Sequence, residues 1–172
     1  PTEMVHIRDV SRQQREIQRA AQLLKAGELV AFPTETVYGI GALGLNVGAV
    51  ERLYAAKNRP AGKAFSLQVA NVNMIQQIAA YVPLMARKLL EKFAPGPITV
   101  VLPKAAQVPE LVTGGRDTVG IRIPDNPVAL AVLQAVGAPL AVPSANISGH
   151  VSPKSGADVF GDMAGRLAMI LD

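Results

Sequence analysis

Cysteine and tryptophan are absent from this 172-residue chain, and histidine occurs only twice. Without cysteine there is no disulfide framework and no thiolate metal site, which fits a reducing compartment, and we expect a cytoplasmic protein. Neither His6 nor His150 lies beside a serine-rich nucleophile motif, so a Ser-His-Asp hydrolase is not indicated. No spacing of histidine with carboxylates resembles a metal site, and no protein-held metal is expected.

Long hydrophobic runs are missing as well, although 49% of the residues are hydrophobic. Glycine, proline or charge interrupts each apolar run well short of the roughly 20 residues of a spanning helix, so no membrane association is expected. Aromatic residues are few and do not alternate with arginine, which argues against a stacking platform for single-stranded nucleic acid. The net charge of +4 is compatible with a nucleotide ligand, with RNA contact, or with an ordinary basic protein.

Short apolar segments alternate with amphipathic ones, which predicts an α/β domain. We predict strands at residues 29–32, 65–69, 98–102, 118–123, 140–142 and 167–171. We predict helices after caps at Ser11 and Asn46, and at residues 73–80, 83–93, 127–136 and 157–163. Residues 33–44 are predicted to form a loop. No linker is evident, so residues 1–172 are expected to form a single domain, and the apolar final segment suggests that the natural protein continues.

Two polar segments directly follow predicted strands. PTETVYGIG, residues 33–41, places hydroxyls and a carboxylate at a strand exit, with glycines that let a ligand approach the backbone. A turn whose threonine hydroxyls satisfy each other is the alternative. PSANISG, residues 143–149, offers neutral donors and acceptors for phosphate oxygens or a base edge, or else an Asx-turn or cap before the last helix.

Two further segments are rich in cations. KNRPAGK, residues 57–63, has three cations that could hold a triphosphate, although it lacks the spacing of a Walker A loop and solvated basic turns are commoner. In residues 116–122, strand alternation places Thr118, Gly120 and Arg122 on one face. An inward arginine needs an anion, which is either a ligand or a carboxylate such as Asp117 or Asp125. This inventory suits the binding of anions more than acid–base catalysis.

Together these segments resemble the YrdC-like family. PTETVYGIG is similar to the family's PTETVYGLG block, Lys57-Asn58-Arg59 to its K-x-R signature, and Ser144-Ala145-Asn146 to its S-x-N signature. Further agreement occurs at residues 93–99, 118–122, 148–149 and 152–153, and the resemblance covers residues 29–172. The joint order and spacing of the blocks make the resemblance highly specific.

The resemblance implies a twisted, open, mixed α/β sheet flanked by helices, with a large basic concave cavity. It also implies a threonylcarbamoyl-adenylate synthase, which joins L-threonine, bicarbonate or CO2, and ATP and releases pyrophosphate. Mg2+ accompanies the ATP. A downstream threonylcarbamoyl-transferase complex then modifies an adenosine of tRNA, and tRNA or double-stranded RNA is a further candidate partner.

By the same resemblance, Lys57 and Arg59 are the catalytic residues. The residues expected at ATP are Arg59, Lys63, Thr118, Ser144 and Asn146. The residues expected at threonine are Thr36, Gln68 and Arg122. The chain departs from the family at Lys63-Ala64-Phe65, where Pro-Leu is common, and at Gln68 and Asn126, where some members have histidine. The family continues past Asp172 with further strands, so those strands and any additional domain are expected to be absent here.

Three alternatives remain open. The first is the carbamoyl-adenylate-handling module of a hydrogenase-maturation carbamoyltransferase, although the zinc-finger-like cysteine clusters of those proteins are missing from this chain. The second is a non-catalytic RNA-binding protein, which salt-dependent RNA binding without ATP consumption would favour. The third is a simple nucleotide-binding regulator.

Overall fold

The computed structural model describes residues 1–60 and 62–172; Ala61, inside the predicted basic turn, lies outside the described residues. The strands are β1 (Glu3–Val5), β2 (Val30–Pro33), β3 (Tyr38–Leu43), β4 (Leu67–Gln68), β5 (Val100–Pro103), β6 (Thr118–Arg122), β7 (Leu140–Ala141) and β8 (Met169–Leu171). The helices are α1 (Gln14–Lys25), α2 (Val47–Lys57), the 3₁₀ helix η1 (Val72–Gln77), α3 (Leu84–Phe93), α4 (Glu110–Thr113), α5 (Pro127–Val136) and α6 (Gly156–Met163).

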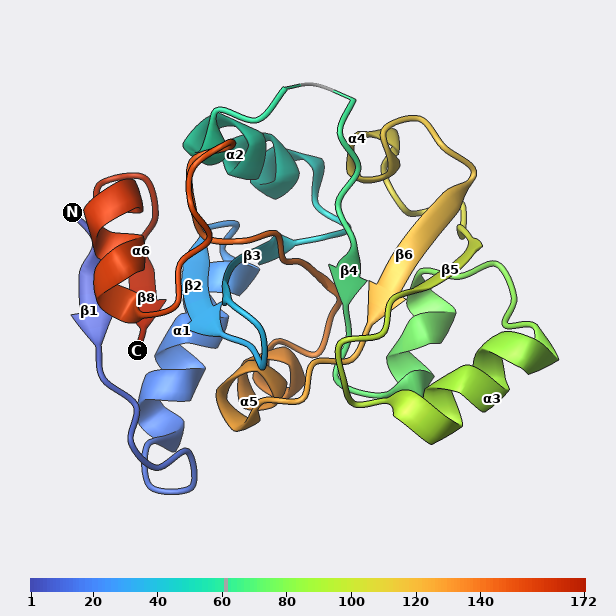
Figure 1. The fold of residues 1–172 in the computed structure, drawn as a ribbon, viewed down its shortest axis with the longest axis horizontal. Helices are drawn as coiled ribbons and strands as arrows, with labels where there is room; N and C mark the ends of the chain where they lie inside the picture. Colours follow the sequence, from blue (N-terminus) through green and yellow to red (C-terminus); the bar gives the residue numbers. More distant parts are fainter. Residues whose placement is uncertain (61) are drawn as a thin grey trace.

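The strands form one mixed sheet in the order β1-β8-β2-β3-β7-β4-β6-β5 (Figure 1). The pairs β1–β8, β8–β2 and β4–β6 are parallel, and the other neighbours are antiparallel. This arrangement confirms the predicted open, mixed α/β sheet. No helix among the described residues is long and apolar enough to span a bilayer.

Explicit capping signals account for the helices that the sequence predicted best. The side chain of Asn46 accepts the Ala49 N–H at the start of α2. The side chain of Asn126 caps α5 in the same way, so this departure from the family pattern has a structural role. The predicted cap at Ser11 is wrong: α1 begins at Gln14, because the Ser11 hydroxyl donates to Asp9 instead.

Two strands were not predicted, β1 and β3. The sequence analysis expected a loop where β3 lies, because its two glycines weaken the strand signal. A Cβ at Gly41 would come within 2.9 Å of the Phe32 ring, and one at Gly39 would overlap Val142, so both positions need glycine for close packing. The final apolar strand, β8, needs a neighbour on each side. Its neighbours are β1 and β2.

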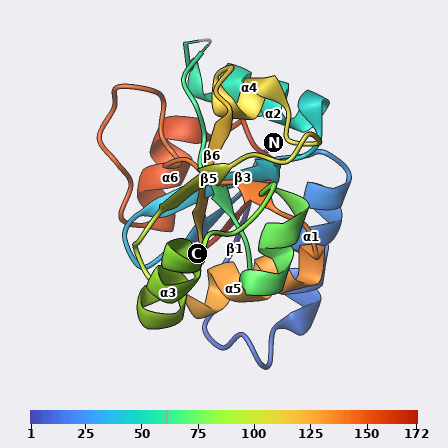
Figure 2. The same cartoon turned by 90° about the vertical axis from the view of Figure 1, so that its right-hand side faces the viewer.

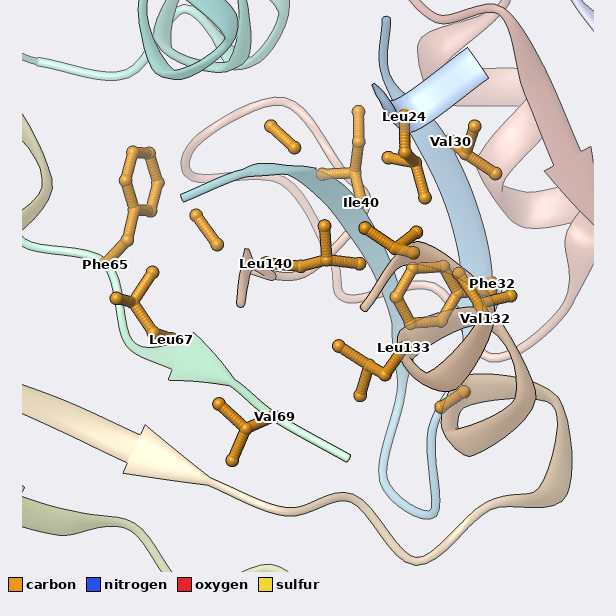
Figure 3. Close-up of a cluster of buried hydrophobic side chains, with 14 of the residues drawn as sticks. Leu24, Val30, Phe32, Ile40, Phe65, Leu67, Val69, Val132, Leu133 and Leu140 are labelled. Carbon is orange, nitrogen blue, oxygen red and sulfur yellow. The ribbon is translucent and has the colours of Figure 1, made fainter. Parts of the chain in front are cut away.

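The hydrophobic core lies between the sheet and helices that include α1 and α5, which lie side by side (Figures 1 and 2). Leu24 of α1, Phe32 of β2 and Leu133 of α5 are fully buried there. In the segment around β4, Phe65, Leu67 and Val69 belong to the same buried cluster (Figure 3). Because strand side chains alternate, the intervening residues Ser66 and Gln68 point to the other face.

Candidate functional site

Strand β6 has one buried face and one accessible face, as the sequence predicted. Val119 and Ile121 are buried, whereas Thr118 is exposed and Gly120 and Arg122 are half-buried. The register with β4 places Gln68 beside Arg122, and the register with β5 places Val101 beside Gly120. The β4, β6 and β5 strands therefore share a face whose side chains are not part of the core.

Arg122 is held at the end of β6 by an acid that the sequence analysis did not identify. Its Nη2 donates to Glu35, and its Nε donates to the Gly96 carbonyl at 3.3 Å. The other carboxylate oxygen of Glu35 accepts the Asp125 N–H at 2.7 Å. Neither Asp117 nor Asp125 supplies the carboxylate, so those predicted partners are wrong. The ion pair instead ties the loop after β2 to the end of β6.

The loop after β2 contains a turn with internal hydrogen bonds and also exposes polar groups. The hydroxyl of Thr34 donates to the Val37 carbonyl at 2.6 Å and accepts the Thr36 N–H at 3.2 Å. Thr36, the predicted threonine-binding residue, is exposed, and its hydroxyl oxygen lies 3.1 Å from that of Thr34. The loop thus fixes the backbone through Thr34 and leaves Thr36 accessible near the Glu35–Arg122 pair.

Gln68 lies at the same end of the sheet and is buried, with 3% of its surface exposed. Its Oε1 atom has no hydrogen-bond partner within residues 1–60 and 62–172. A buried amide oxygen without a partner is costly, so a donor from a ligand would satisfy it. Gln68 and Arg122 together therefore present an acceptor and a cation, the groups that an amino acid requires.

The K-x-R and S-x-N segments are joined directly by Lys57. Lys57 is 2% exposed, and its ammonium donates to the carbonyls of Ser144 at 2.5 Å and Asn146 at 2.7 Å. Burial and, to a smaller extent, the charge of Arg59 lower the pKa of Lys57 to about 8, whereas Asp162 opposes the shift. Since an ammonium has three donors, one remains for a ligand.

The S-x-N segment is held by its own amide rather than by the last helix. Asn146 Nδ2 donates to the carbonyls of Ile147 at 2.8 Å and His150 at 3.0 Å, while its Oδ1 is buried without a partner among the described residues. The cap of α6 is Ser155, so the alternative in which this segment caps that helix is wrong. Ser144 is half-buried at the end of β7.

Arg59 is positioned without an acidic partner in residues 1–60 and 62–172. Its Nη2 donates to the Ala64 carbonyl at 2.8 Å, and its guanidinium lies 4.3 Å from the centre of the Phe65 ring. Nε is buried and has no partner among the described residues, and burial lowers the pKa of the group. Lys63 is exposed on the same turn. Phe65, at the departure from the family pattern, is therefore the platform for Arg59.

The structure groups the predicted residues into three clusters. Lys57, Ser144 and Asn146 are joined by hydrogen bonds, and Gln68 and Arg122 are joined by register. The third cluster is the turn before β4, where Arg59 is held by the Ala64 carbonyl and Lys63 is exposed; Thr118 is exposed at the start of β6. The large basic cavity stays a prediction.

Comparison with known proteins decides the family. The Sua5/YciO/YrdC family model, described as telomere recombination, matches residues 22–172. The chain belongs to this family. It is 44% identical over 156 residues to threonylcarbamoyl-AMP synthase of Pyrococcus abyssi, covering 91% of this chain and 46% of that protein. It is 37% identical over 157 residues to the enzyme of Vibrio vulnificus, covering 90% of this chain and 84% of the relative.

A solved structure of this family agrees with the fold. The P. abyssi Sua5 structure in complex with L-threonine superposes with a TM-score of 0.94 at 41% identity, covering all of this chain and 50% of the other. The chain therefore spans about half the length of the P. abyssi protein. In this chain the K-x-R and S-x-N segments are separate in sequence, and Lys57 connects them physically.

The pKa of Lys57 predicts a pH dependence of stability. The folded protein titrates Lys57 near 8, against 10.5 for an ordinary lysine, so the unfolded chain binds more protons between these values. The free energy of unfolding should therefore rise with pH in that window, by about 2 kcal/mol between about pH 7.5 and about pH 9.5. Urea unfolding of the wild type and of Lys57→Met at both pH values measures this contribution. If the free energy of unfolding changed equally with pH in the two proteins, the prediction would be contradicted.

Proposed function

We propose that this chain is a threonylcarbamoyl-AMP synthase, which makes threonylcarbamoyl-AMP and pyrophosphate from L-threonine, bicarbonate or CO2, and ATP. The observation that carries the proposal is the pair Lys57 and Arg59, neither of which forms an ion pair within the described part of the chain. Two cations that no internal acid neutralises are suited to a polyanion. The names of the relatives support the same activity.

The two ends of the accessible face would bind different substrates. At one end Arg122 would hold the carboxylate of threonine, with the unpaired Gln68 oxygen accepting a hydrogen bond and Thr36 exposed nearby. At the other end Arg59 and Lys63 would contact the ATP phosphates. Thr118 and Ser144 would contact the nucleotide, and Asn146 would hold the Ser144 segment in place.

The reaction needs no protein nucleophile. The threonine amine adds to CO2 and loses a proton, which gives a carbamate. A carbamate oxygen then attacks the α-phosphorus, and the new P–O bond forms as the bond to pyrophosphate breaks. Lys57 and Arg59 would stabilise the charge that develops on the phosphates, and fixed donors of this kind contribute up to about 3–4 kcal/mol each. Holding the substrates together lowers the barrier further.

Magnesium would enter with ATP as part of that substrate. Among the described residues, no group of three or more histidine, cysteine or carboxylate side chains could hold a metal ion. The phosphate oxygens of ATP, rather than protein side chains, would therefore be the ligands of Mg2+. We further propose that residues 1–172 act as one catalytic domain in the cytoplasm, with a threonylcarbamoyl transferase acting on tRNA as the consumer of the product. Direct RNA contact is part of the same proposal.

A pyrophosphate-release assay tests the proposed function. With ATP, Mg2+ and bicarbonate, addition of L-threonine should raise the rate at least about tenfold, and mass spectrometry should detect threonylcarbamoyl-AMP. Arg59→Ala should remove most of the threonine-dependent rate, because alanine supplies neither the charge nor the hydrogen-bond donors of the guanidinium. Arg87→Ala, in helix α3, is the matched control and should retain it. Equal release with and without threonine would refute the activity.

A further inference from the structure

The centre of the accessible face of β6 is a glycine flanked by two hydroxyl residues. A Cβ built on Gly120 would come within 2.9 Å of Ser66 Oγ and 3.1 Å of Thr99 Cγ2. Ser66 precedes β4 and Thr99 precedes β5, so the three residues come from three separate segments. Both hydroxyl residues are exposed, and they lie on either side of a position that has no side chain.

Gly120 is not required for backbone conformation. It is not among the glycines with a positive φ, and it lies within a regular strand that pairs on both sides. Other residues adopt such extended backbone readily, and glycine weakens a strand. What Gly120 provides is close approach: without a Cβ, Ser66 and Thr99 close over the strand from both sides, so their side chains form the surface that a ligand would meet there.

The register places this pair of hydroxyl residues halfway between the two proposed substrate ends. Thr118 and Arg122 are four residues apart on β6, which corresponds to about 13 Å, and Gly120 is about 6–7 Å from each. If threonine lies at Arg122 and the nucleotide at Thr118, the carbamate and the α-phosphate meet between them. The atoms that react would then lie over the Ser66 and Thr99 side chains that flank Gly120, which come from the two neighbouring segments.

We propose that the Ser66 and Thr99 hydroxyls contact the reacting atoms and donate hydrogen bonds to the carbamate and to the α-phosphoryl oxygens. This inference rests on the proposed function. Hydroxyls suit the position because they donate to developing negative charge without adding a cation that would retain pyrophosphate. Their donors are aimed at the transition state, so they should affect kcat more than KM.

A purely structural role for the two residues predicts a different result. Both side chains are exposed, while the packing in their segments comes from buried neighbours such as Phe65 and Val100. Removal of either hydroxyl should therefore leave the melting temperature unchanged. A change in kcat without a change in stability separates the two interpretations.

Steady-state kinetics of Ser66→Ala and Thr99→Val test the inference, with threonylcarbamoyl-AMP and pyrophosphate as readouts. We expect each substitution to lower kcat by about tenfold or more, with the KM values for ATP and threonine within about threefold of wild type. Thr99→Ser, which keeps the hydroxyl, should restore kcat to within about threefold. Ser11→Ala, on the N-terminal turn, is the matched control and should behave as wild type.

The outcomes distinguish this inference from the function on which it rests. If wild type forms threonylcarbamoyl-AMP and both substitutions keep the wild-type kcat, the inference is overturned and the function stands. An increase confined to KM would also overturn it, because the hydroxyls would then bind substrate without acting on the transition state. If wild type forms no threonylcarbamoyl-AMP, both proposals fail together.

Discussion

Replacing Arg122 with leucine is expected to raise the KM for L-threonine by about 100-fold or more while the KM for ATP changes by less than about threefold. Nη2 and Nε of Arg122 are engaged by Glu35 and Gly96, and the rest of the guanidinium remains for a substrate carboxylate. Hydrogen bonds to charged groups contribute about 1.5–3 kcal/mol each, and a factor of ten corresponds to about 1.4 kcal/mol. Two such bonds account for the expected loss.

The same substitution should cost some stability. The side chain of Glu35 is 18% exposed and would lose its cationic partner. It would keep the hydrogen bond from the Asp125 N–H. We expect the free energy of unfolding to fall by about 1–3 kcal/mol. Arg116→Leu, at an exposed position just before β6, is the matched control and should change neither quantity. Equal increases in the KM for threonine and for ATP would show that Arg122 does not bind threonine specifically.

Lys57→Met is the second substitution with a large expected effect. Methionine fills a similar volume but leaves the Asn146 carbonyl without its donor, while the Ser144 carbonyl keeps only the Asn146 N–H. An unpaired buried group costs about 1–3 kcal/mol, so we expect the free energy of unfolding to fall by about 1–3 kcal/mol. Urea unfolding measures this loss.

Catalysis should suffer as well, because the S-x-N segment loses its anchor and the site loses a cation. We expect kcat/KM for threonine-dependent pyrophosphate release to fall at least about 100-fold. Lys25→Met, in the last turn of α1, removes an exposed lysine and should have little effect on stability or activity. A Lys57→Met protein with wild-type stability and activity would show that the link between the two signatures is dispensable.

The sequence predicted the start of α2, both ends of α5 and the candidate cations, but not the partners of those cations. Asn46 and Asn126 cap helices through local hydrogen bonds, so a local pattern is sufficient to find them. Arg122 and Glu35 are 87 positions apart, and Lys57 is anchored by main-chain oxygens, which no residue type reveals. These contacts depend on strand order and register, which only the folded chain determines.

The same reason explains why Ser66 and Thr99 escaped the sequence analysis. Neither residue belongs to one of the four polar segments that were considered, and both gain interest only because they flank Gly120 across strands. The alternation of Thr118, Gly120 and Arg122 was predictable from period alone, and the structure confirms it. The two hydroxyl residues that flank Gly120 could have been identified only with knowledge of the strand order β4-β6-β5.

Strand β3 is a point of sensitivity beside the proposed nucleotide site, because Gly39 bridges Ser144. Residues 38–41 of β3 pair with β2 and residues 42–43 pair with β7, so β3 connects the two halves of the sheet. Any side chain at Gly39 would push Val142 aside, and Ser144 follows two residues later. Displacement there would travel along the chain to the oxygen that holds the Lys57 ammonium. Variation at this glycine would thus disturb the proposed ATP site from a neighbouring strand, and a screen for inactive variants would identify it alongside the cations.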